Sequence, residues 1–132
     1  MAVTVKWLES RQFVGTDSTG HSVVLSSPAD GVGVKPSDLL LLALAGCTAY
    51  DVVDILEKKR KKLRKLAIEV SAEQEKEPPW TFRRIHAVYR LTGDLDERAV
   101  RQAIQLSEEK YCAVAATLRG AAQLTSEYTI DR

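Results

Sequence analysis

The stretch SDLLLLALAGCTAYDVVDIL, residues 37–56, decides how this chain folds. Its segment from Leu39 to Cys47 is nine residues long and carries no charge and no polar group except the thiol of Cys47. The turns that follow are amphipathic, with apolar residues interleaved with acidic ones. A helix that is apolar around its whole circumference must be covered on every side, so this stretch predicts a central helix.

The flanking residues predict a helix from about residue 36 to residue 60. Pro36 fixes a backbone angle suited to a first helical turn, and Asp38 places a negative charge near the helix start. The run EKKRKKLRK at the far end places cations where the helix dipole is negative. Because a short chain has few elements with which to cover such an apolar helix, we expect a second subunit to supply part of the cover.

The chain has 132 residues, which suits a single domain over residues 1–132. Its hydrophobic content of 45%, charged content of 28% and net charge of +1 are ordinary for a globular protein and give no overall attraction to nucleic acid or lipid. The N-terminal MAVTVKWLES lacks the pattern of a signal peptide, and the longest apolar run is shorter than the roughly 20 residues that cross a bilayer. We therefore expect a cytoplasmic protein with neither a nucleic acid nor a membrane as partner.

Period-two alternation predicts strands on both sides of the central helix. Residues 66–73 and 83–91 alternate in this way around the connection KEPPW, and GDLDERAVRQAIQLSEEKY then predicts a second helix, with Asp94 or Asp96 as its cap. The order of strands, helix, strands, helix and strand indicates an α+β fold. The other expected strands cover residues 2–8, 20–26 and 124–130, and the apolar face of the second helix comprises Ala99, Val100, Ala103, Ile104, Ser107 and Tyr111.

Several kinds of site find little support in the sequence. The basic run from Lys58 to Lys65 contains no interleaved aromatic residues and lies where a helix end favours cations anyway. His21 and His86 fall in separate strands, and no pair of ligands has zinc-like spacing. No glycine-rich phosphate loop is present either. We expect no metal and no cofactor.

Two thiols remain, Cys47 and Cys112, and either could be a packing residue, because free cysteine behaves as a small hydrophobe. A reactive Cys47 needs a nearby cation, since the thiolate is the nucleophile and an apolar wall alone raises the pKa of a thiol. Arg11 is one candidate for that cation, and Asp38 could orient its guanidinium.

The segment KPSDLLLLALAGCTAYDVVDILEKKR, together with LSEEKYCAVAATL, resembles the OsmC/Ohr superfamily, the osmotically inducible and organic hydroperoxide resistance proteins. The resemblance is strongest to the branch of small OsmC-like proteins. It implies an OsmC-like fold in which antiparallel sheets wrap around long central helices in an intertwined homodimer, with strands of one subunit extending the sheet of the other. The apolar helix would then be the core of the dimer.

The resemblance also implies a peroxidase activity on organic hydroperoxides that needs neither metal nor flavin. Cys47 would attack the peroxide and become a sulfenic acid, Cys112 would resolve it as a disulfide, and a dithiol or lipoyl-type reductant would restore both thiols. The family's peroxidases carry a glutamate directly after the helix-initiating proline. This chain has Ser37 there, with Asp38 one position later and about 100° around the helix.

Three hypotheses therefore stand beside one another. The chain is a two-cysteine peroxidase of oxidative stress defence, or a non-catalytic OsmC-like dimer that acts as a ligand-binding or redox-sensing module near Cys47. In the third, both thiols only fill space in the core.

Overall fold

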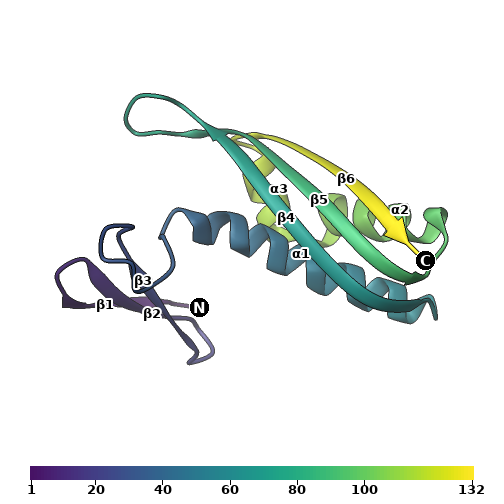
Figure 1. Ribbon diagram of the computed structural model, residues 1–132, viewed down its shortest axis with the longest axis horizontal. Coiled ribbons are helices and arrows are strands. Elements are labelled where there is room, and N and C mark those ends of the chain that lie inside the picture. The colour runs from purple at the N-terminus through teal and green to yellow at the C-terminus, as the bar shows by residue number, and fades with distance from the viewer. The chain divides into compact units, whose positions relative to one another are not determined.

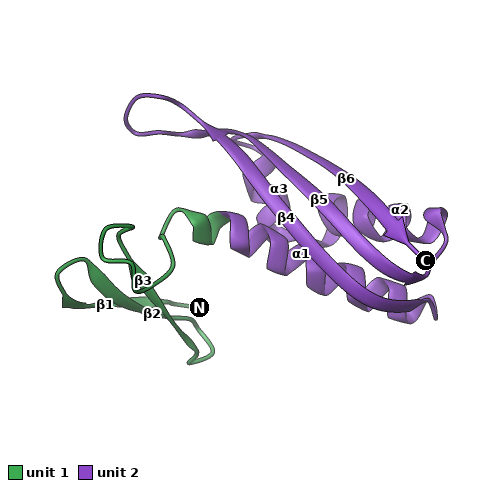
Figure 2. Ribbon diagram, viewed as in Figure 1, with its two compact units in different colours: residues 1–40 green, residues 41–132 purple.

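The structure is a computed structural model that describes residues 1–132, and it confirms the expected α+β class (Figure 1). The chain forms two compact units, residues 1–40 and residues 41–132, which Figure 2 shows in different colours. Each unit has a three-stranded sheet of its own. The single domain expected over residues 1–132 stays a prediction.

The first unit is an antiparallel sheet in the order β1-β2-β3, formed by β1 (Thr4–Glu9), β2 (Gln12–Thr16) and β3 (Ser22–Ser26). β1 and β3 confirm the strands that alternation predicted over residues 2–8 and 20–26. The middle strand was missed, because its neighbouring apolar residues and a glycine hide the period of two.

One face of this first sheet is apolar and exposed. The register places Val5 opposite Gly15 and Trp7 opposite Phe13, so these residues share a face. Val5 is 61% exposed and Trp7 is 69% exposed. An apolar face of this kind is typical of a surface that packs against another element or another subunit.

The central helix α1 extends over Asp38–Lys58, within two residues of both expected limits. Its first turn carries the acid Asp38 and its last turn the base Lys58, which suits the helix dipole. Other apolar residues of the helix are exposed, including Leu42 by 54% and Tyr50 by 72%. The fully buried residues form one stripe at intervals of four, which consists of Leu44, Thr48, Val52 and Leu56.

By length and composition alone, α1 could also cross a membrane, with a mean hydropathy of 1.9 over its most apolar window. The core helix of a soluble protein passes the same test, so composition does not distinguish the two cases. The expected absence of a membrane partner stays a prediction.

The second unit contains a mixed sheet in the order β4-β5-β6. β4 (Lys62–Gln74) and β5 (Phe82–Asp94) are antiparallel and confirm the two strands predicted around KEPPW. β5 and β6 (Gln123–Asp131) are parallel, which corrects the expectation of antiparallel sheets throughout. The reason is that β6 follows a helical crossover, residues 95–122, where a tight turn would have produced an antiparallel neighbour.

The crossover consists of α2 (Glu97–Leu106), the π-helical turn η1 (Ser107–Tyr111) and α3 (Ala113–Arg119). The Asp96 carboxylate accepts a hydrogen bond from the N–H of Ala99 at 3.1 Å, which confirms Asp96 as the cap. Tyr111 is 55% exposed, so its assignment to the apolar face was wrong. A π turn holds one residue more than an α turn, and the helical period therefore does not continue through η1.

The three helices pack on the face of the sheet that carries the odd-numbered residues of β5, as Figure 1 shows for the second unit. The larger of two hydrophobic clusters joins α1, β5 and α2. Its buried residues are Val52, Leu56, Ala87, Tyr89, Leu91, Leu95, Ala99, Val100, Ala103 and Ile104.

We predict that Leu56→Ala lowers the free energy of unfolding by about 2–5 kcal/mol, because it leaves a cavity where α1 meets the sheet. Leu56 is fully buried, whereas the neighbouring Glu57 is exposed. Urea unfolding at one fixed protein concentration measures the change, with Glu57→Ala as the control. Equal decreases in the free energy of unfolding for Leu56→Ala and Glu57→Ala would contradict this packing.

Candidate functional site

The second unit brings the two predicted thiols together. Cys47 lies in α1 and is partly buried, and Cys112, between η1 and α3, is 3% exposed. Both cysteines are reduced and belong to the smaller hydrophobic cluster. Its other members come from α1, both long strands, α3 and β6, and include Leu41, Leu44, Val70, Phe82, Ile85, Val114, Ala115, Leu118 and Leu124.

The surroundings of Cys47 favour the neutral thiol. Burial is the main cause. The neighbouring Cys112 thiol and the Asp51 carboxylate act in the same direction, and together these effects raise the pKa of Cys47 to about 11. The backbone N–H of Val114 acts in the opposite direction. No lysine or arginine is among the groups that act most on this thiol. Within the second unit, burial and a neighbouring acid therefore oppose the thiolate, and a reactive Cys47 needs a cation to offset them.

Backbone hydrogen bonds fix the position of Cys112. Its N–H donates to the carbonyl oxygen of Ser107 at 2.8 Å, the bond that closes the π turn. Its sulfur accepts from the N–H of Ala115 at 3.3 Å, so the side chain caps α3. The thiol therefore faces the interior, while the preceding Tyr111 is exposed.

Polar side chains hold the π turn against three other elements of the second unit. The Ser107 hydroxyl donates to the Asp51 carboxylate of α1 at 2.8 Å. The Glu108 carboxylate accepts from the hydroxyl of Tyr89 in β5 and from that of Ser126 in β6, each at 3.0 Å. Burial raises the pKa of Tyr89, so its hydroxyl stays a donor.

Sequence reasoning missed this polar cluster, which consists of Asp51, Tyr89, Ser107, Glu108 and Ser126. Only one signal was available: Asp51 lies four residues after Cys47, which places both on one side of the helix. The partners of Glu108 come from strands 19 residues before it and 18 residues after it, a pairing that no local pattern contains.

The other two predicted site residues belong to the first unit. Arg11 lies in the β1–β2 turn, where its guanidinium donates to the carbonyl oxygen of Ser10 at 3.2 Å. The acid beside it is Asp30, which accepts from the Arg11 backbone N–H at 2.9 Å, and no hydrogen bond or ion pair joins Arg11 to Asp38. The proposed roles of Arg11 and Asp38 at Cys47 stay predictions.

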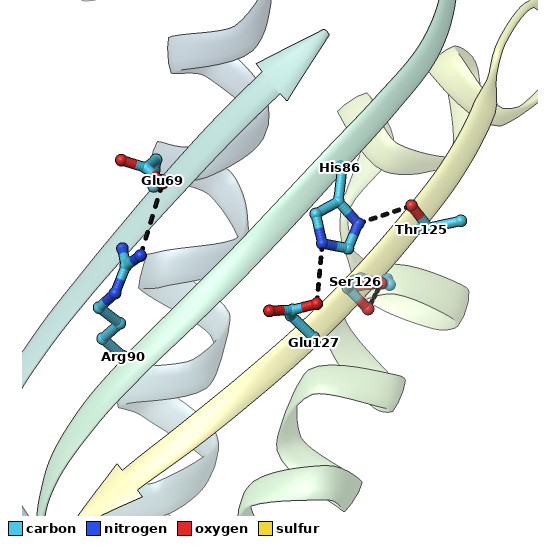
Figure 3. Close-up of polar contacts among 7 residues, drawn as sticks. Glu69, His86, Arg90, Thr125, Ser126 and Glu127 are labelled. Atoms are coloured by element: carbon cyan, nitrogen blue, oxygen red, sulfur yellow. Dashed lines mark hydrogen bonds and ion pairs between the residues drawn. The ribbon is translucent and has the colours of Figure 1, made fainter.

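A second polar cluster lies on the other face of the β4-β5-β6 sheet (Figure 3). The imidazole of His86 is 2.7 Å from the Thr125 hydroxyl and 3.2 Å from the Glu127 carboxylate. Arg90 and Glu69 pair across β5 and β4 at 3.5 Å. These are cross-strand contacts on an exposed surface, and no group of three or more acidic, histidine or cysteine residues is placed to hold a metal ion.

A groove of about 820 Å³ lies between the crossover and β6. It shares Glu108 and Ser126 with the polar cluster, and its lining includes neither cysteine. Arg101 and Arg119 contribute positive charge, and Glu108, Glu109 and Glu127 contribute negative charge. The mixed charge gives the groove no preference for one sign of ligand.

Residues 29–127 match the family described as OsmC-like protein. The Escherichia coli protein YhfA is 35% identical over 131 residues, which cover 98% of both chains. Two solved structures share the fold. An OsmC-like protein from Mycoplasma pneumoniae is 17% identical, with a TM-score of 0.86 and coverage of 99% of this chain and 96% of its own. The organic hydroperoxide resistance protein OhrB of Bacillus subtilis is 19% identical, with a TM-score of 0.65 and coverage of 97% and 96%.

We predict that Asp51→Asn lowers the pKa of Cys47, because it removes a negative charge that disfavours the thiolate. At pH 8, which is below the pKa of the thiol, a lower pKa gives a larger thiolate fraction. The reduced variant therefore reacts faster with iodoacetamide at this pH. The matched control is Asp54→Asn in the same helix, since Asp54 is paired with Lys58 at 2.9 Å. Equal rates of Cys47 alkylation in wild type and Asp51→Asn would contradict the assignment.

Proposed function

Because the chain belongs to the family of OsmC-like proteins, we propose that it is a thiol-dependent peroxidase that reduces organic hydroperoxides in oxidative stress defence. The observation that carries the proposal is the contact between two reduced cysteines inside one apolar cluster. An apolar cluster suits the organic part of a hydroperoxide. The fold shared with a protein named for organic hydroperoxide resistance supports the same activity.

The reaction begins with the Cys47 thiolate, which attacks one oxygen of the peroxide bond. An S–O bond forms, the O–O bond breaks, and the second oxygen leaves as an alcohol after it takes up a proton. The sulfenic acid of Cys47 is then attacked by Cys112, so that a disulfide forms and water leaves. A dithiol reductant, such as a lipoyl group, reduces the disulfide to two thiols and is itself oxidised.

This chemistry needs a cation near Cys47, and Arg11 is our candidate. Its guanidinium is exposed and makes one hydrogen bond, within its own turn, so it is available to a thiolate. A guanidinium beside Cys47 would favour the charged form and oppose the effect of burial. Asp38 would orient this guanidinium in the role that a glutamate has at the preceding position of the family's peroxidases.

We further propose that the protein acts as a cytoplasmic homodimer. The exposed apolar side of α1, which includes Leu42 and Tyr50, needs a cover that a second copy can supply. The apolar face of the first sheet is also exposed and could likewise be covered by a second copy. Trp7 is its most exposed aromatic residue. Association of two copies would bury both surfaces and exclude water from the surroundings of the thiols.

Two observations favour the second candidate function, a ligand-binding or redox-sensing module. The thiol of Cys47 has a raised pKa, and Ser37 stands where the family's peroxidases have their glutamate. A thiol of this kind reacts slowly with peroxide but can still sit beside a bound apolar molecule. Tight binding of such a molecule with negligible peroxide consumption is the result that this function predicts.

We predict that the reduced protein consumes cumene hydroperoxide rapidly in stopped-flow measurements and that Cys47→Ser abolishes the consumption. Mass spectrometry then finds an intramolecular disulfide in wild type. In Cys112→Ser it finds a sulfenic acid at Cys47, because the resolving thiol is missing. Equally slow consumption by all three proteins would exclude the peroxidase and favour the binding module.

We predict that Arg11→Gln slows the first turnover with peroxide, because it removes the charge that we assign to thiolate stabilisation. Arg11→Lys keeps a positive charge and retains part of the rate, although a lysine cannot form the planar, two-pronged contacts of a guanidinium. Single-turnover consumption measured from pH 6 to pH 10 separates a change in the thiol pKa from a change in the limiting rate. If the rate of peroxide consumption by Arg11→Gln depends on pH as it does in wild type, Arg11 does not act at the site.

A further inference from the structure

Side chains from four separate elements hold the π turn η1. Ser107 donates to Asp51 of α1, and Glu108 accepts from Tyr89 of β5 and Ser126 of β6. A fourth contact comes from Arg119 of α3, whose guanidinium donates to the carbonyl oxygen of Glu108. Two consecutive residues of one short turn are therefore hydrogen-bonded to α1, β5, β6 and α3.

One of these contacts connects the two elements that carry the thiols. Asp51 follows Cys47 by one helical turn, and the turn that starts at Ser107 ends with the N–H of Cys112. The hydrogen bond between Ser107 and Asp51 thus joins the helix that carries one sulfur to the turn that carries the other. Ser107 is fully buried and Asp51 is partly buried, so this bond is largely shielded from water.

We propose that the hydrogen bonds of Ser107 and Glu108 form a positioning clamp that holds Cys112 against Cys47 and sets how readily the two sulfurs form a disulfide. The role as resolving cysteine rests on the proposed function, but the clamp itself concerns only the placement of the pair. Asp51, Tyr89, Ser107 and Glu108 are positioning residues in this scheme, since none of them exchanges electrons with the substrate.

The physical reason is the geometry that a disulfide demands. The sulfurs must approach to about 2.0 Å with a narrow range of Cβ separations, so a loosely held segment seldom reaches the bonding arrangement. Fixing the segment in advance raises the effective concentration of one thiol toward the other. A π turn without its anchors could relax toward the regular α-helical period and turn Cys112 away from Cys47.

The test measures disulfide formation without any peroxide. Each reduced protein is equilibrated with mixtures of reduced and oxidised glutathione, where the protein dithiol and oxidised glutathione give the protein disulfide and two molecules of glutathione. Alkylation and mass spectrometry then give the fraction of intramolecular disulfide, and hence the effective concentration of the pair. We expect Ser107→Ala and Tyr89→Phe each to lower it by about tenfold, as for the loss of a hydrogen bond to a charged group.

Two further variants separate positioning from general disturbance. Asp51→Ala removes the acceptor of Ser107 and should lower the effective concentration as Ser107→Ala does. Glu109→Ala changes an exposed neighbour in the same turn and should match wild type. If Ser107→Ala does not fold by circular dichroism, Tyr89→Phe decides, because it removes one oxygen and keeps the ring.

Unchanged or higher effective concentrations in both Ser107→Ala and Tyr89→Phe would overturn the clamp. Failure of the proposed function gives a different result, which is no peroxide consumption together with a normal glutathione equilibrium. The two proposals can therefore fail independently of each other.

Discussion

The packing of one narrow stripe of α1 against the β4-β5-β6 sheet is the constraint on which the second unit depends. Leu44, Thr48, Val52 and Leu56 are the only residues of this helix that are fully buried. The stripe sets how α1 is rotated against the sheet, and Cys47, one residue before Thr48, lies beside it. The rotation that buries the stripe therefore also brings Cys47 to the inner face where Cys112 lies.

The same packing explains why the thiol pair is well placed but poorly activated within the second unit. An apolar cluster brings two sulfurs into contact and excludes water, and both effects favour neutral thiols. Reactivity then depends on a charge from elsewhere, since no basic residue is among the groups that act most on Cys47. The packing of the second unit thus supplies a matched pair of thiols, and the activating charge is a separate requirement of the proposed peroxidase.

Much of this could be predicted from local pattern. The limits of α1, the alternation of the two long strands and the Asp96 cap each depend on neighbours within a few residues, and all were confirmed. The parallel pairing of β6 and the exposure of Tyr111 were not predictable, because they follow from the crossover and from a π turn without a sequence signature. The anchors of Glu108 lie in two other strands, so only the folded chain shows them.

The parallel pair of β5 and β6 has a consequence for the order of folding. β6 cannot take its place until residues 95–122 have crossed the sheet, and such non-local pairing forms late. Cys112 is carried on that crossover, while Cys47 lies 65 residues earlier in α1. A newly made chain therefore passes through a stage in which both thiols are exposed and apart, and an oxidant present at that stage would meet two ordinary cysteines instead of a matched pair.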